Sequence, residues 1–404
     1  MKHAFLALVA LALTVTVAQA DSLNVRLVGY CDTPGYAKDV AVAGNYAYVA
    51  AGFAGLRVIS VSDPAHPTEV GYCETKSDAL GVAVAGDYAY VTDGSMGLRV
   101  ISVSDPAHPT EVGYYRTASY ARGVAVAGNY AYVADGFDGL RVISVSDPAH
   151  PTEVGYCETR QASAAGVALA GNYAYVTATY SGLLVISVSD PAHPTEVGYL
   201  SRSGAQGVTV AGDYAYVADY STGLRIVSVS DPAHPVEVGY CNTPGGAFGV
   251  AVVGNYAYVA NYYTGLRVIS VSDPADPTEV GYYDMPGLAY DVAVVGNHAY
   301  VADDTIGLQI CQFYGAGIEE GRQPRANGLR PTATVIRGVL VLGAVGSRQN
   351  TGYRAELLDA SGRKVLDIRA GANDVSRLAP GVYFVSERGT KNEEPRTVRI
   401  VIQH

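Results

Sequence analysis

Short apolar runs separated by turn-forming residues fill most of the chain, and one stretch shows the pattern clearly. Residues 123–127 are a small apolar run, Gly128-Asn129 follows, and residues 130–134 continue with alternate tyrosines. Two β-prone runs joined by a Gly-Asn pair predict a tight hairpin. Residues 139–145 and 152–156 predict two further strands, so we expect a four-stranded antiparallel meander.

This pattern recurs with a period of about 42 residues. Asp-Pro pairs mark six copies, at steps of 42, 42, 43, 41 and 42: Asp63, Asp105, Asp147, Asp190, Asp231 and Asp273. A repeat of this length with four strands is typical of a β-propeller blade. Seven second strands can be counted, beginning at Tyr46 and ending with the copy at His298. The pattern therefore predicts an all-β, seven-bladed propeller over residues 21–313.

The two ends of the repeat region predict how the ring closes. The first Val-Gly-Tyr strand, in residues 26–31, precedes the first blade, whereas the last unit stops after its third strand at Gln312-Phe313. We expect the N-terminal strand to complete the seventh blade, because that pairing removes the open sheet edges of a linear array.

The amino-acid sequence of the repeat unit is itself informative. Residues 139–151 read Gly-Leu-Arg-Val-Ile-Ser-Val-Ser-Asp-Pro-Ala-His-Pro, and this run recurs nearly unchanged in six copies. It resembles the LVIVD-repeat family of bacterial surface propellers over roughly residues 27–313. The resemblance implies a β-propeller but no agreed activity.

The remainder of the chain predicts a separate module. Residues 314–331 read as a linker, and residues 332–404 contain alternating strand runs that predict a small β-sandwich. Residues 357–365 and 373–385, with the basic ending around Arg396, resemble the C-terminal sorting domain of the type IX secretion system, although Arg330-Pro331 stands where that family opens with Asn-Pro. The resemblance implies an address tag read by the type IX secretion machinery. An ordinary accessory sandwich is the alternative.

The N-terminus predicts export. Residues 1–20 combine a basic start, an apolar stretch too short for a confident membrane span and an Ala-Gln-Ala cleavage site, as in a secretory signal peptide. We expect a mature chain without a membrane span that is secreted or held at the cell surface. The net charge of −11 and the lack of a basic stripe argue against nucleic acid as a partner.

Position-by-position comparison removes most candidates for chemistry. The turn histidines, from His66 to His234, and the turn aspartates recur around the circumference and cannot converge on a metal. Asp93 and its equivalents at the end of the second strand are expected to accept loop amides, with a calcium site as the alternative. We predict no metal and no cofactor. A disulfide between Cys31 and Cys311 at the ring closure is left open.

One rim of the ring varies between copies, whereas the other repeats. Repeat proteins place their binding differences on one face, and aromatic and arginine side chains are enriched in binding surfaces. Residues just before each first strand should ring the channel mouth. The candidate ligand-binding residues on this rim are Lys38, Arg122, Gln206, Phe248, Tyr290, Tyr120, Phe137 and Tyr262. Relaxed drift of unconstrained loops is the competing explanation.

We therefore expect a binding or adhesion scaffold that contacts a surface protein or glycan through this rim. A secreted hydrolase or lyase acting at the channel mouth is the alternative, for which the mixed set of Lys38, Arg122, Asp39 and Asp291 is the hint. A structural surface protein without a small ligand is the third hypothesis. No catalytic residue is predicted.

Overall fold

The computed structural model describes residues 22–160 and 162–314, together with the backbone of seven strands in the C-terminal region. The chain divides into two compact units, residues 1–316 and 317–404, and each is described by itself. The predicted signal peptide (1–20) and nearly all of the predicted linker (314–331) lie outside the described residues.

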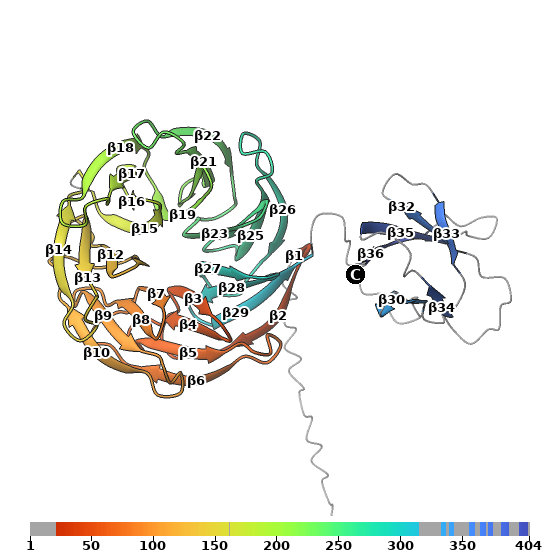
Figure 1. Ribbon diagram of the computed structural model, residues 1–404, viewed down its shortest axis with the longest axis horizontal. Helices are drawn as coiled ribbons and strands as arrows, with labels where there is room; N and C mark the ends of the chain where they lie inside the picture. The colour runs from red at the N-terminus through yellow and green to blue at the C-terminus, as the bar shows by residue number, and fades with distance from the viewer. Residues whose placement is uncertain are drawn as a thin grey trace, which may run out of the picture. The chain divides into compact units, whose positions relative to one another are not determined.

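The first unit is a ring of seven antiparallel sheets, six of which are built from four strands that follow one another in the chain (Figure 1). The first three sheets are β3 (Asp39–Ala43), β4 (Tyr46–Ala50), β5 (Leu56–Ser60) and β6 (Thr68–Cys73); β7 (Gly81–Ala85), β8 (Tyr88–Thr92), β9 (Leu98–Ser102) and β10 (Thr110–Tyr115); and β11 (Val124–Ala127), β12 (Tyr130–Ala134), β13 (Leu140–Ser144) and β14 (Thr152–Cys157). The next three are β15 (Ala164–Ala170), β16 (Tyr173–Ala178), β17 (Gly182–Ser187) and β18 (Thr195–Ser201); β19 (Ala205–Ala211), β20 (Tyr214–Asp219), β21 (Gly223–Ser228) and β22 (Val236–Cys241); and β23 (Gly249–Val253), β24 (Tyr256–Ala260), β25 (Leu266–Ser270) and β26 (Thr278–Tyr283). The predicted all-β, seven-bladed propeller is confirmed.

The seventh sheet joins strands from both ends of the unit. It contains β27 (Ala289–Val295), β28 (His298–Asp303) and β29 (Gly307–Phe313), and its fourth strand is β2 (Val25–Cys31). β2 runs antiparallel to β29, with Val25 opposite Phe313 and Cys31 opposite Leu308. β1 (Ser22–Leu23) adds a short edge to β26 of the sixth sheet.

A glycine in the fourth strand allows neighbouring blades to approach closely. The Val-Gly-Tyr sequence forms a β-bulge, as at Val112 between Glu111 and Gly113, where one residue of the partner strand opposes two. A Cβ on Gly113 would lie 2.2 Å from the carbonyl oxygen of Pro148 in the Asp-Pro turn of the next blade. The invariant glycine and the invariant turn thus fit each other across every blade interface of this kind.

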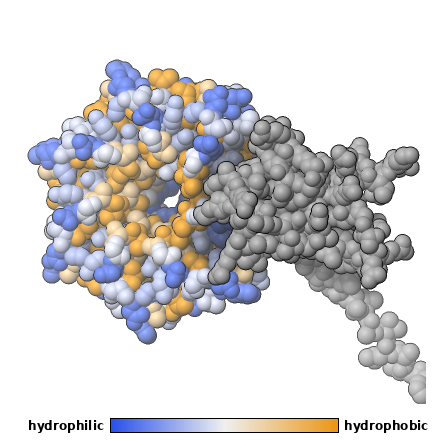
Figure 2. Space-filling model, turned by 45° about the vertical axis from the view of Figure 1, so that its right-hand side comes forward, coloured by the Kyte–Doolittle hydropathy of each residue, from blue (hydrophilic) through white to orange (hydrophobic). Residues whose placement is uncertain are grey.

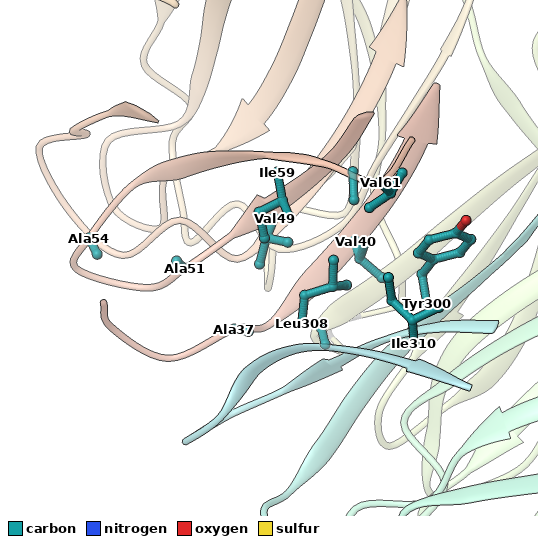
Figure 3. Close-up of a cluster of buried hydrophobic side chains, with 12 residues drawn as sticks. Ala37, Val40, Val49, Ala51, Ala54, Ile59, Val61, Tyr300, Leu308 and Ile310 are labelled. Carbon is teal, nitrogen blue, oxygen red and sulfur yellow. The ribbon is translucent and has the colours of Figure 1, made fainter. Parts of the chain in front are cut away.

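The hydrophobic core lies between the blades rather than at the centre of the ring. Between the seventh and first blades, Val40, Val49 and Ile59 pack against Leu308 and Ile310, and all five side chains are buried (Figure 3). Both faces of the inner strands are covered by another sheet, which explains why the repeat reads as continuous apolar runs rather than strict alternation.

The second unit contains two sheets. One has the order β30 (Ala333–Ile336), β31 (Val339–Leu342) and β34 (Gly371–Asp374). The other has the order β33 (Lys364–Ile368), β32 (Ala355–Asp359), β35 (Gly381–Glu387) and β36 (Arg396–Ile402).

Candidate functional site

Each blade contributes one residue, at the start of its first strand or just before it, to a single cavity at the mouth of the central channel. These residues are Lys38, Leu80, Arg122, Ala165, Gln206, Phe248 and Tyr290. The cavity has a volume of about 630 Å³ and continues inward along the first strands, past small valines and glycines. Figure 2 shows one face of the propeller, on which hydrophobic residues surround a central opening. This volume lies in the range of about 300–1,000 Å³ that is usual for small-molecule sites.

The cavity wall has one position at which two blades differ from the other five. The residue directly after the mouth residue is glycine in five blades: Gly81, Gly123, Gly166, Gly207 and Gly249. It is aspartate in the first and seventh blades, which are neighbours in the ring. The channel wall therefore carries two carboxyl groups, Asp39 and Asp291, side by side at one point of its circumference.

Backbone amides hold this carboxyl pair. The Val40 amide donates to Asp39 Oδ1 at 2.7 Å, and the Val82 amide of the next blade donates to Asp39 Oδ2 at 2.8 Å. Asp291 Oδ2 lies 3.5 Å from the Val40 amide. A Cβ on Gly249 would lie 2.2 Å from Asp291 Oδ1, so glycine there leaves space for the carboxyl.

The Asp291 carboxyl binds its proton more tightly than an ordinary aspartate does. Burial in the channel wall, the nearby Asp39 charge and a hydrogen bond with the Asp39 side chain raise the pKa of Asp291 well above its usual range. Two adjacent carboxyl groups ionise together only at a cost, which disfavours the charged form of Asp291. A carboxylic acid donates through its O–H and accepts through its carbonyl oxygen, so such a group can hydrogen-bond to a ligand hydroxyl in either direction.

Lys38 is neutralised within the protein. Its Nζ lies 2.7 Å from Asp304 Oδ1 and 3.7 Å from the centre of the Tyr290 ring. Arg122, in contrast, is exposed and forms no ion pair with any residue that the structure describes. Arg122 belongs to the third blade, so it lies across the channel mouth from Asp39 and Asp291 rather than in a cluster with them.

Aromatic side chains of the fifth to seventh blades form one wall of the mouth. The Phe248 ring lies 5.5 Å from Tyr220, 5.0 Å from Tyr262 and 5.1 Å from Tyr290, between ring centres. A hydrogen bond of 3.4 Å joins the hydroxyls of Tyr290 and Tyr262, and this bond, together with burial, raises the pKa of Tyr262 to about 12. We call Tyr220, Phe248, Tyr262 and Tyr290 the aromatic wall.

Two of the predicted rim residues, Tyr262 and Phe137, do not line the cavity. Tyr120 lines the cavity beside Arg122, and its hydroxyl lies 3.4 Å from Asp78 Oδ2. Phe137 is 66% exposed on the loop between β12 and β13 and does not line the cavity. The structure therefore brings together Lys38, Arg122, Gln206, Phe248, Tyr290 and Tyr120, places Tyr262 behind Phe248, and leaves Phe137 apart.

Asp304, Asp39 and Asp291 are absent from the rim residues predicted as ligand-binding. Asp39 and Asp291 could have been recognised by comparing the seven copies. Aspartate replaces glycine at this repeat position only in the first and seventh blades, which become neighbours when the ring closes. The ion pair of Lys38 with Asp304 could not be predicted in this way, since the two residues are 266 positions apart in the sequence.

The strand-end aspartates accept loop amides, as expected. Asp93 accepts the amides of Lys76 and Ser77 at 3.1 and 3.0 Å, and Asp135 accepts the amide of Ser119 at 3.0 Å.

The turn histidines bond within their own turns; the His66 Nδ1–Asp63 Oδ2 distance, for example, is 2.9 Å. Cys31 and Cys311 are both free thiols, and they lie opposite Leu308 and Leu27 rather than each other. Within the described residues, no helix is long and apolar enough to cross a membrane.

Known structures resemble the ring in fold. The RRP9 WD40 repeats match with a TM-score of 0.60 and 11% identity, covering 73% of this chain and 99% of that one. The WD40 β-propeller domain of Doa1 matches with a TM-score of 0.58 and 10% identity, covering 72% and 97%. The computationally designed Ika8 protein matches with a TM-score of 0.54 and 8% identity, covering 71% and 99%. At these identities the likeness concerns the fold alone.

The repeat itself has a recognised family. No curated protein sequence matches the chain significantly. The family model described as "LVIVD repeat" matches seven consecutive segments: residues 34–75, 77–117, 118–159, 162–201, 203–243, 244–285 and 286–311. Because these segments make up well over half of the chain, the protein belongs to the LVIVD repeat family.

Proposed function

We propose that the propeller is a binding scaffold whose ligand occupies the channel mouth. One observation carries the proposal: the seven mouth residues, one from each blade, differ from blade to blade, yet all of them line a single cavity. Loops that vary without functional constraint are not expected to place an arginine without an ion-pair partner among the described residues, an aromatic wall and a carboxyl pair around one opening.

The opposite rim, whose turns repeat from blade to blade, is a poorer binding surface. There the Asp-Pro-Ala-His turn recurs with the same geometry, and the Nδ1–Oδ2 distance is 2.9 Å in the turns of both His66 and His108. Because equivalent turns offer equivalent contacts, this rim has little capacity to recognise one ligand in one orientation.

We also propose that the protein acts outside the cell, as a secreted or surface-attached binding or adhesion module for a surface protein or glycan. The support is the signal-like sequence of residues 1–20 and the resemblance of residues 332–404, a candidate β-sandwich, to a type IX sorting domain. In this proposal the type IX secretion machinery is a partner during export only.

A hydrolase or lyase at the same mouth is the second candidate function. Its support is the Asp39–Asp291 pair, since a carboxyl with a raised pKa beside one that accepts hydrogen bonds is an arrangement suited to acid–base chemistry. Turnover of a bound ligand that is lost in Asp291→Asn, while binding is retained, would favour the enzyme.

The binding proposal is tested by screening the full chain against a glycan array and by pull-down of surface proteins. The triple variant Arg122→Ala, Phe248→Ala, Tyr290→Ala should lose the detected ligand. The matched control is His66→Ala, His108→Ala, His150→Ala, which changes three exposed side chains on the repeating rim and should bind as the parent does. Binding that survives the triple variant would refute the proposal.

We further propose that β2 closes the ring. Its support is the antiparallel ladder from Val25 opposite Phe313 to Cys31 opposite Leu308, which covers the edge of β29. Removing residues 22–31 should lower the melting temperature strongly, whereas removing only Ser22 and Leu23 should change it little. An unchanged melting temperature in the longer deletion would contradict the closure.

A further inference from the structure

The two opposite sides of the channel mouth differ in chemistry. Its aromatic wall comes from the fifth to seventh blades, and Arg122 comes from the third. In a ring of seven, the third blade faces the sixth and seventh across the opening. A ligand in the mouth therefore meets aromatic faces on one side and a guanidinium on the other.

The two cations at the mouth are not equivalent. Lys38 Nζ forms an ion pair with Asp304 Oδ1 at 2.7 Å and a cation–π contact with the Tyr290 ring. Arg122 is held by its backbone, because its amide donates to the Ala134 carbonyl at 2.8 Å and its carbonyl accepts the Thr92 hydroxyl of the preceding blade. Its guanidinium has no ion-pair partner among the described residues, and a planar fork of donors is suited to a carboxylate.

The third feature is the carboxyl pair in the channel wall below the aromatic wall. Asp39 is occupied by two backbone amides, and Asp291 stands next to it with partial exposure to the channel. Neutral hydroxyl groups can exchange hydrogen bonds with this pair, whereas a ligand carboxylate would be repelled by it. The pair thus directs a ligand's own carboxylate away from the first and seventh blades, toward Arg122.

We propose that the channel mouth binds a carboxylated pyranose, that is, a uronic-acid-type sugar, with its carboxylate on Arg122, one ring face on Phe248 and Tyr290, and its hydroxyls toward Asp39 and Asp291. Sugar C–H groups carry partial positive charge and pack on the electron-rich faces of aromatic rings. This inference rests on the proposed binding function and names its ligand class. Free sugar acids and the uronate units of a glycan chain share this chemistry.

The test uses the full chain and two matched probes in calorimetric titrations: a glucuronate-containing oligosaccharide and the same oligosaccharide with its carboxyl groups reduced to alcohols. The parent protein should bind the carboxylated probe at least about tenfold more tightly, because a charge-assisted pair is lost on reduction. Arg122→Gln should lower affinity for the carboxylated probe by a similar factor and leave the reduced probe unchanged. Arg116→Gln is the matched control, since Arg116 is an exposed arginine of the same loop that does not line the cavity.

The outcomes separate this inference from the proposed function. Equal affinity for both probes, or an unchanged affinity in Arg122→Gln, would overturn the uronate assignment. A ligand of another class that the Arg122, Phe248 and Tyr290 triple variant loses would overturn the uronate assignment but leave the binding function intact. Free glucuronic acid and the oligosaccharide, titrated in parallel, distinguish a sugar-acid site from a glycan-chain site.

Discussion

Arg99 is the position at which a single substitution tests the energetics of this fold most directly. Its side chain is 2% exposed, and its Nε donates to Asp93 Oδ2 at 3.0 Å. Asp93, fully buried, also accepts the amides of Lys76 and Ser77, which belong to a loop of the variable rim. This buried ion pair therefore anchors one of the loops on the rim that carries the candidate site.

Other blades have different residues at the positions equivalent to Asp93 and Arg99, and these combinations can be compared. The first blade has Ala51 with Arg57, and there the Arg57 Nε has no hydrogen-bond partner. The fourth blade has Ala178 with Leu184, which is fully buried. In the seventh blade a neutral donor replaces arginine, and Gln309 Nε2 donates to Asp303 at 2.6 Å. No blade combines the strand-end aspartate with an apolar partner.

Arg99→Leu creates the missing combination, a buried carboxylate without its cation. Removing one partner of a buried pair costs about 3–5 kcal/mol, because the remaining charge is uncompensated. Asp93→Ala should cost less, about 2 kcal/mol, because Arg99 keeps the carboxylate of Glu111 at 3.6 Å, as Arg57 keeps Glu69 in the first blade, and the main loss is that of the two loop amides' acceptor. The double variant reproduces the fourth blade and should be close to Asp93→Ala, which gives a coupling of at least about 2 kcal/mol.

The assay is urea unfolding followed by tyrosine fluorescence, to which the 32 tyrosines and the absence of tryptophan are suited. The free energies of unfolding of the parent, both single variants and the double variant complete the cycle. If Arg99→Leu were as stable as the parent, or if the double variant lost the sum of the two single costs, the argument from buried charge would be refuted.

Three further predictions concern the carboxyl pair, the blade interface and the thiols. Since burial and Asp39 raise the pKa of Asp291, the folded state binds a proton more tightly than the unfolded chain, so the free energy of unfolding should fall as pH rises above the usual aspartate pKa of about 4. In Asp291→Asn the free energy of unfolding should depend less on pH over that range; an unaltered pH dependence would count against the raised pKa of Asp291. Gly113→Ala should destabilise the ring by about 1–3 kcal/mol, because its Cβ would lie 2.2 Å from the Pro148 carbonyl oxygen, and calorimetry showing no change would be inconsistent with the close approach. Cys311, fully buried with a raised pKa, should resist alkylation of the native protein while the four half-buried cysteines react; mass spectrometry showing equal labelling would contradict this.

Much of the candidate site follows from comparing the copies within one chain. The mouth residues Lys38, Arg122, Gln206, Phe248 and Tyr290 are recognisable because they stand at one repeat position and differ in every blade. Their meeting in one cavity follows from the ring, since equivalent positions of seven blades point to a common axis.

Other parts of the site depend on contacts that no repeat position reveals. The 2.7 Å pair of Lys38 with Asp304 and the position of Tyr262 behind Phe248 follow from loop conformations, in which Tyr262 itself adopts a positive φ of 28°. Loop conformation depends on local packing rather than on periodicity, so the sequence pattern does not specify it.

The repeat, the number of blades and the variable rim can all be predicted from the sequence, because hydrophobic periodicity and turn chemistry are local properties of the chain. Which residues act together depends instead on how the blades are arranged in the ring. Asp39 and Asp291 are 252 positions apart, and they lie side by side because the ring brings the first and last blades into contact. Arg122 has no ion-pair partner among the described residues for the converse reason, since the same geometry places it across the opening from both.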